Sequence, residues 1–106
     1  GALAEANGAQ LAPHLYCGPI VGAANVQLAT CSPNFLILES IRDWSGIHAD
    51  LLVTPMQFED GHVIPPTAPG LGVELNEEFA RANPYTGDQL HLQMDPNPVT
   101  PRSDRF

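Results

Sequence analysis

Apolar residues in the first third of the chain form two short runs, separated by a longer segment with a different spacing. The first run, residues 9–13, ends in a proline, which cannot donate a hydrogen bond to a sheet and therefore closes a predicted strand. Residues 20–30 place apolar side chains at the i, i+3 and i+4 positions of an amphipathic helix. The second run, 35–38, has no polar alternation, which is typical of strands buried on both faces of a parallel sheet. The pattern predicts a right-handed βαβ unit and thus an α/β fold.

Outside this unit the periodicity is weak, and short-range signals take its place. The alanine-rich residues 1–7 predict a short helix. Asp60-Gly61 predicts a two-residue hairpin turn. Asn76 can cap a short helix that runs to Ala82, with two glutamates favourably placed in its first turn. The proline-rich stretches around these elements predict irregular chain, which we expect to cover part of a larger protein.

The composition limits the classes of partner. The chain has 43% hydrophobic residues, as a globular protein does. Its formal net charge is −8, with no lysine and only four arginines, which argues against nucleic-acid binding. No apolar run approaches the ~20 residues that cross a bilayer, so we expect no membrane partner. Cys17 and Cys31 lie at opposite ends of the predicted helix, too far apart for a disulfide, which indicates a reduced, cytoplasmic protein.

One titratable residue follows each predicted strand: His14 after the first and Glu39 after the second. In a βαβ unit both strands end at the same edge of the sheet, about 4.8 Å apart if they are adjacent. An imidazole can take and return a proton near neutral pH, and a carboxyl group can hydrogen-bond an enolate, so the pair suits proton abstraction from carbon. Other interpretations stay open: His14 as a structural residue, and Glu39 as a helix N-terminal carboxylate or an ion-pair partner of Arg42.

Four motifs carry a family resemblance. They are Leu-Ala-Pro-His at 11–14, Cys-Gly-Pro-Ile at 17–20, Asn-Phe-Leu-Ile-Leu-Glu at 34–39 and Pro-Gly-Leu-Gly-Val-Glu at 69–74. The first three resemble the seventh strand, the start of the seventh helix and the eighth strand of the mandelate racemase and enolase superfamily. The fourth resembles a motif near the C-terminus of that family. Over roughly residues 1–85 the chain is most similar to galactonate-type acid-sugar dehydratases.

The resemblance implies the C-terminal portion of a (β/α)8 TIM-type barrel, incomplete by itself. Residues 1–52 would supply strand 7, helix 7 and strand 8. Residues 53–106 would be a hairpin- and proline-rich segment that packs on an N-terminal capping domain. The chain would begin within the sixth helix, so we expect further residues upstream and an inactive protein in their absence.

The resemblance also implies a reaction: Mg2+-dependent removal of the proton next to a sugar acid's carboxylate, then loss of water to give a 2-keto-3-deoxy acid. His14 corresponds to the acid/base residue and Glu39 to the residue that hydrogen-bonds the carboxylate. The metal ligands are expected on upstream strands, with none in this chain. The full-length protein is expected to be a homo-oligomer. Trp44 is a weaker substrate-binding candidate beside Glu39, with a packing role as the alternative.

Two other functions remain open. A racemase or epimerase of the same superfamily would need a second base on the opposite face of the substrate, from a strand outside this chain. A small noncatalytic αβ binding domain, complete in itself, would need neither residue for chemistry. The remaining histidines, at positions 48, 62 and 91, show no metal-ligand spacing.

Overall fold

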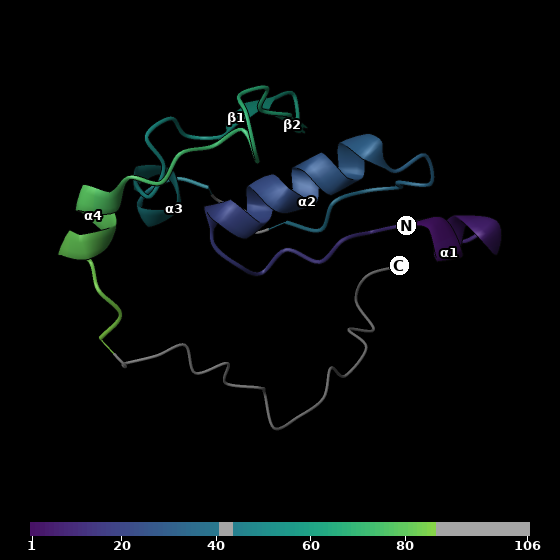
Figure 1. Cartoon of the computed structure of the whole chain (residues 1–106), viewed down its shortest axis with the longest axis horizontal. Helices are drawn as coiled ribbons and strands as arrows, with labels where there is room; N and C mark the ends of the chain where they lie inside the picture. Colours follow the sequence, from purple (N-terminus) through teal and green to yellow (C-terminus); the bar gives the residue numbers. More distant parts are fainter. Residues whose placement is uncertain (41–43, 87–106) are drawn as a thin grey trace, which may run out of the picture.

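The computed structural model describes residues 1–40 and 44–86. Within these ranges, four helices and one two-stranded sheet are joined by extended chain (Figure 1). In order they are α1 (Ala2–Ala6), α2 (Pro19–Cys31), α3 (Ile47–Asp50), β1 (Gln57–Glu59), β2 (His62–Ile64) and α4 (Glu77–Ala82). The proposed link between Glu39 and Arg42, the histidine at position 91 and the final proline-rich residues lie outside the described parts of the chain.

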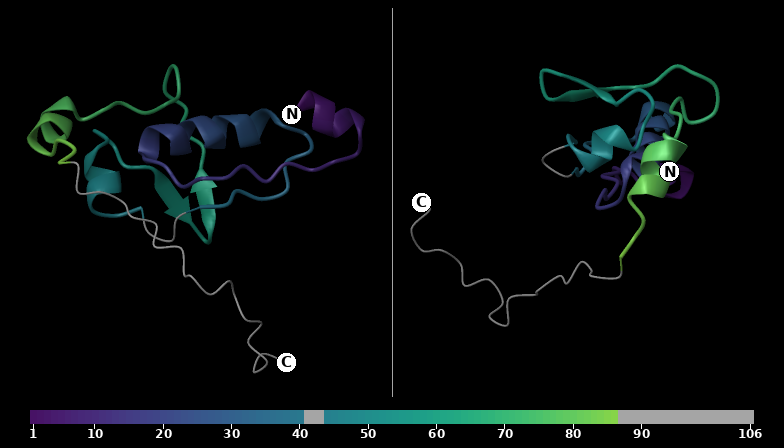
Figure 2. Two further views of the ribbon diagram at one scale, coloured as in Figure 1. Left: turned by 90° about the horizontal axis from the view of Figure 1, so that it is seen from below. Right: turned by 90° about the vertical axis from the view of Figure 1, so that its left-hand side faces the viewer.

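The helix of the predicted βαβ unit, α2, lies along the extended segments before and after it, and neither segment forms a regular strand (Figures 1 and 2). A parallel bridge pairs Leu11 with Phe35, and Leu11 exchanges hydrogen bonds with the backbone on either side of Phe35, both at 2.8 Å. The next rung is irregular, because Pro13 has no N–H and its carbonyl accepts from Glu39 instead of residue 38. The two predicted strands are therefore extended segments joined at one bridge, in the predicted parallel direction.

The buried face of α2 differs from the predicted one. Pro19, Gly22, Ala23 and Val26 are buried and follow the i, i+3, i+4, i+7 spacing of one helix face. The predicted face began at Ile20, which is exposed. Almost every position of α2 is apolar or small, so periodicity alone does not single out one side.

The hairpin forms as predicted. β1 and β2 pair antiparallel, with Phe58 opposite Val63. Asp60 and Gly61, at the turn, have φ angles of 47° and 78°. Two successive positive φ values match a type I′ turn, whose twist suits a hairpin. A local two-residue signal therefore set both the position and the register of this sheet.

The loop that follows the hairpin is held against α2 by hydrogen bonds to the loop's backbone carbonyls. Gln27 of α2 donates to the carbonyls of Pro66 and Leu71, at 2.9 and 3.3 Å. Gly72 has φ +79°, and a Cβ at this position would lie 2.7 Å from Cβ of Pro66. Glycine is therefore required at position 72 for two reasons: the positive backbone angle and the close approach of the loop.

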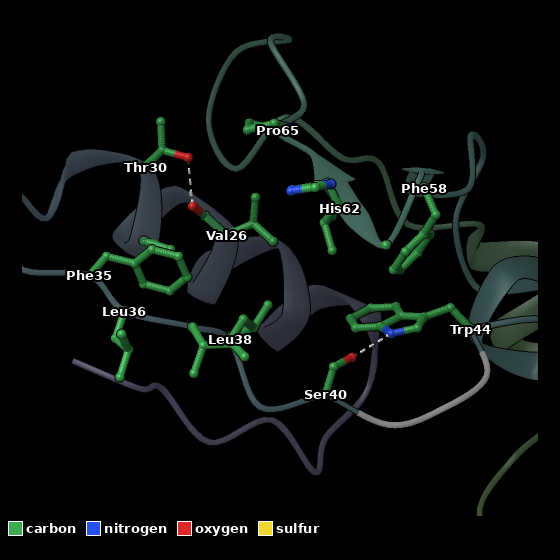
Figure 3. Close-up of a pocket in the computed structure, with 14 residues that line it drawn as sticks. Val26, Thr30, Phe35, Leu36, Leu38, Ser40, Trp44, Phe58, His62 and Pro65 are labelled. Atoms are coloured by element: carbon green, nitrogen blue, oxygen red, sulfur yellow. Dashed lines mark hydrogen bonds between the residues drawn. The ribbon is translucent and has the colours of Figure 1, made fainter. Parts of the chain in front are cut away.

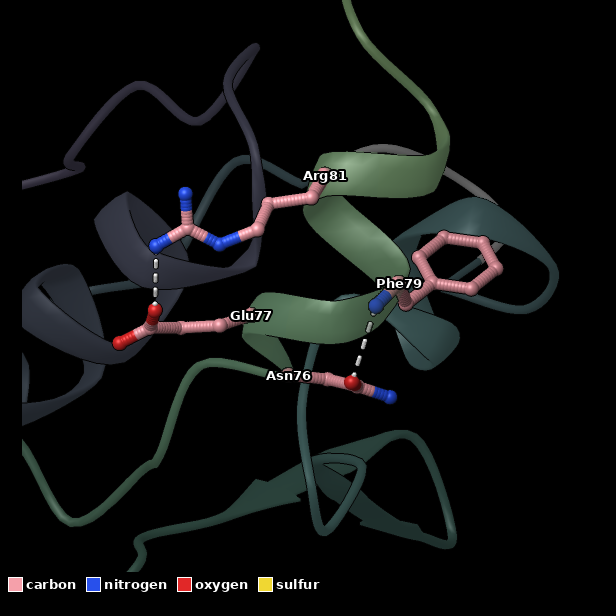
Figure 4. Close-up of polar contacts among 4 residues, drawn as sticks. All are labelled: Asn76, Glu77, Phe79 and Arg81. Atoms are coloured by element: carbon pink, nitrogen blue, oxygen red, sulfur yellow. Dashed lines mark hydrogen bonds and ion pairs between the residues drawn. The ribbon is translucent and has the colours of Figure 1, made fainter.

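α4 has several stabilising contacts within its own sequence. Asn76 accepts a hydrogen bond from the backbone N–H of Phe79 through its side-chain oxygen, at 3.1 Å, as predicted for a capping residue (Figure 4). Arg81 forms an ion pair with Glu77 one turn earlier, at 2.8 Å (Figure 4). An antiparallel bridge just before the helix joins Leu52 to Leu75 and connects α4 to the rest of the chain.

Cys17 and Cys31 are both free, as their placement at the ends of one helix predicted, and both are exposed. Across the residues described, no helix has the length and apolar character needed to span a lipid bilayer.

Candidate functional site

His14 and Glu39 lie side by side, as the strand pattern predicted. The backbone N–H of Glu39 donates to the carbonyl of Pro13, the residue before His14, at 3.1 Å. The two side chains leave the same end of the parallel pair, and Nε2 of His14 lies 3.7 Å from Oε1 of Glu39. Residues 25 positions apart in the sequence therefore meet because the two segments run parallel.

The pair is open to solvent and not locked by a short hydrogen bond. The side chain of His14 is 68% exposed and that of Glu39 is 63% exposed. At 3.7 Å the contact is longer than a hydrogen bond and becomes an ion pair when the imidazole is protonated. The ring of Tyr16 is stacked at a centroid distance of 6.4 Å from that of His14. An imidazole and a carboxylate thus share one accessible edge, where each can contact a small molecule.

Trp44 contacts Ser40, the residue after Glu39, but lines a groove separate from the His14/Glu39 pair. It lines an apolar groove of about 630 Å³ between α2, residues 35–40 and the hairpin (Figure 3). Neither His14 nor Glu39 lines this groove. The indole ring is half-buried, packs on Phe58 at a centroid distance of 5.5 Å, and donates its N–H to Oγ of Ser40 at 2.7 Å. These contacts match the packing alternative for Trp44, and its role in substrate binding stays a prediction.

Metal-ligand chemistry has little support in this part of the molecule. Within residues 1–40 and 44–86, no three His, Cys, Asp or Glu side chains gather in a way that could hold a metal ion. Mg2+ prefers several oxygen ligands in octahedral geometry, and the Glu39 carboxylate next to an imidazole does not provide them. The described residues do not by themselves fit a magnesium site.

Sequence reasoning missed two residues of α2 that contact the site. The side-chain amide of Asn25 donates to the carbonyl of His14 at 3.1 Å. Gly22 is buried under the ring of Trp44, and a Cβ at this position would overlap Cη2 and Cζ3 of that ring. An amide side chain within a mostly apolar helix was an available signal for Asn25, one that it shares with Gln27. The sequence offered none for Gly22, since its partner is distant in the chain.

Comparisons with known proteins agree with this arrangement. The family model described as "Enolase C-terminal domain-like" matches residues 1–79. The D-gluconate dehydratase of Thermoproteus tenax is 38% identical over 99 residues, which cover 92% of this chain and 20% of the relative. The D-galactonate dehydratase of Pectobacterium atrosepticum is 41% identical over 87 residues, which cover 74% of this chain and 22% of the relative.

Solved structures show the same relationship. A protein from Labrenzia alexandrii assigned to the mandelate racemase/muconate lactonizing enzymes is 65% identical, with a TM-score of 0.80 over 86% of this chain and 24% of its own. A mandelate racemase/muconate lactonizing enzyme from Sulfitobacter sp. is 47% identical, with a TM-score of 0.77 over 93% of this chain and 24% of its own.

The chain spans about a fifth to a quarter of the length of these proteins. The predicted fold class, a portion of an enolase-type (β/α)8 barrel, is confirmed at the level of the family. The parallel pairing of the two extended segments, the family match over residues 1–79 and the agreement in backbone lead to one conclusion: this chain belongs to the enolase C-terminal domain-like family.

Proposed function

We propose that this chain is part of an acid-sugar dehydratase in which His14 and Glu39 act directly on the substrate. The enzyme would remove the proton on the carbon next to a carboxylate and eliminate water to give a 2-keto-3-deoxy acid. The observation that carries the proposal is the placement of an accessible imidazole 3.7 Å from an accessible carboxylate at one end of a parallel strand pair. This is the edge at which α/β proteins of the barrel type bind their ligands.

The two side chains have complementary roles in this reaction. His14 exchanges a proton with the substrate at the carbon next to the carboxylate, because an imidazole changes its protonation near neutral pH. Glu39 hydrogen-bonds the substrate carboxylate, and this contact strengthens as the enediolate forms. The β-hydroxyl group then leaves with a proton as water, and the resulting enol rearranges to the ketone. The relatives named as gluconate and galactonate dehydratases support this choice of reaction.

The magnesium requirement is part of the proposal, with all of its ligands outside this chain. When bound, Mg2+ stabilises negative charge on a substrate carboxylate. The roles given to His14 and Glu39 depend only on where the chain places these two side chains. We likewise propose that the intact enzyme is a cytoplasmic homo-oligomer and that residues 53–106 contact a capping domain.

The proposal is tested on the complete polypeptide that contains this chain, assayed for keto-acid formation from a panel of aldonic acids with Mg2+. His14→Asn is expected to lower kcat by roughly 10²–10⁴-fold, the usual contribution of a general acid or base. The matched control is His62→Asn, the same change at the exposed hairpin histidine, which should leave kcat unchanged. Removal of divalent cations with a chelator is expected to abolish turnover in the parent protein.

Two results would contradict the dehydratase assignment. Exchange of the substrate's α-proton with solvent deuterium, without loss of water, would identify a racemase or epimerase that uses the same His14. Neither elimination nor exchange on any acid of the panel would favour a noncatalytic binding domain.

A further inference from the structure

We propose that α2 sets the geometry of the His14/Glu39 pair through two of its residues, Asn25 and Gly22, and that Gly22 acts through the ring of Trp44. Asn25 acts on the His14 side and Gly22 on the Glu39 side. All three are positioning residues, because none of them has to touch the substrate. The inference rests on the proposed function of the His14/Glu39 pair and adds the source of its alignment.

The His14 side depends on one hydrogen bond to the backbone. The Nδ2 amide of Asn25 donates to the carbonyl oxygen of His14 at 3.1 Å. His14 lies in extended chain with no regular strand pairing, because the ladder becomes irregular at Pro13. A side-chain donor from the neighbouring helix therefore supplies a restraint that the sheet does not.

The Glu39 side depends on the absence of a side chain at Gly22. The ring of Trp44 occupies the space that a Cβ of Gly22 would fill, so the indole lies against the backbone of α2. Its N–H donates to Oγ of Ser40, the residue after Glu39, at 2.7 Å (Figure 3). Trp44 thus connects the chain next to Glu39 to a fixed point on α2.

Trp44 is held from two directions. Gly22 of α2 lies on one side of the indole. The ring of Phe58 of β1 packs on the indole at a centroid distance of 5.5 Å, with an angle of 48° between the rings (Figure 3). Gly22 and Asn25 are three residues apart on α2, so they are neighbours on the helix surface. One turn of one helix therefore restrains both members of the proposed catalytic pair.

The variant Gly22→Ala tests the Glu39 side in the complete polypeptide. The added methyl group meets the ring of Trp44, so the ring and the Ser40 segment have to move. We expect kcat to fall by roughly 10- to 100-fold with KM little changed, since a misplacement of about 1 Å can cost that much. The matched control is Gly18→Ala, at the N-cap of the same helix, where a Cβ meets nothing within 4 Å and φ is −69°.

A second test uses a milder change on the His14 side. Asn25→Ala removes a single hydrogen bond from a half-buried side chain, so folding is expected to survive. We expect a similar fall in kcat with KM little changed. Combining Gly22→Ala with Trp44→Leu removes the ring that the new methyl group meets, but also its hydrogen bond to Ser40, so kcat is expected to stay reduced.

Crystal structures of the same variants supply a readout that does not depend on activity. The separation of Nε2 of His14 from Oε1 of Glu39 is expected to change in Gly22→Ala and Asn25→Ala, and to stay as in the parent protein in Gly18→Ala. An unchanged separation in both variants would overturn the inference, whether or not the parent protein is a dehydratase. A changed separation in a protein without dehydratase activity would uphold the positioning role and reject the proposed reaction.

Discussion

Two helices of this chain, α2 and α4, are stabilised in opposite ways. α4 has six residues and none of them is buried, but it has a side-chain cap at Asn76, two acidic residues in its first turn and an ion pair between Glu77 and Arg81. α2 has 13 residues, no charged side chain at either end and no side-chain cap, but four of its residues are buried.

The contrast shows that nearby residues in the sequence specify α4, whereas distant residues specify α2. The stabilising contacts of α4 lie within six consecutive residues, Asn76 to Arg81, so the local sequence specifies them. α2 gains its stability from packing against distant segments, and its end groups contribute little. A substitution in the buried face of α2 should therefore lower the free energy of unfolding more than the loss of any single local contact of α4.

The largest effect is expected from Val26→Ala in α2. Val26 is 4% exposed, and removing its two methyl groups is expected to cost about 2 kcal/mol, from lost burial and the cavity left behind. Hydrogen exchange of the α2 amides in the complete polypeptide measures this loss. The matched control is Val21→Ala on the exposed side of the same helix, which is 43% exposed. Equal losses for the two variants would mean that the packed face is assigned wrongly.

An intermediate effect is expected from Asn76→Ala. The change leaves the backbone N–H of Phe79 without its side-chain acceptor, which typically costs about 1 kcal/mol. Faster exchange of the α4 amides, with α2 unaffected, is the expected result. Asn76→Asp keeps an acceptor oxygen at the cap and should preserve protection. If Asp and Ala destabilise α4 equally, the cap is not what stabilises it.

The smallest effect is expected from Glu77→Gln, which weakens the ion pair with Arg81. Both side chains are mostly exposed, at 68% and 78%, so the loss should be about 0.3–0.5 kcal/mol. It should shrink in ~1 M salt, where charges are screened over about 3 Å. Glu78→Gln removes a carboxylate from the same first turn without touching this pair, so the difference between the variants isolates it. A loss that persists in salt would contradict an ion-pair origin.

The candidate site combines local and distant information. The positions of His14 and Glu39 after two apolar runs were enough to predict that they lie at one edge of the sheet, because parallel strands joined by a helix end at one edge. That the two segments are neighbours, so that the side chains meet, is shown by the structure. The irregular rung at Pro13 followed from the chemistry of proline. The contacts of Asn25, Gly22 and Trp44 were not predicted, because each joins segments whose spacing carries no periodic signal.

The sequence by itself determined the direction of the strand pair, the hairpin turn at Asp60-Gly61 and the capped helix after Asn76. Each of these depends on residues within a few positions of one another, or on the helical crossover that joins parallel strands. The tertiary structure alone decided which face of α2 is buried and where Trp44 packs. In a helix that is apolar on nearly all sides, periodicity does not show which face is buried. Close packing against the neighbouring segments selects that face.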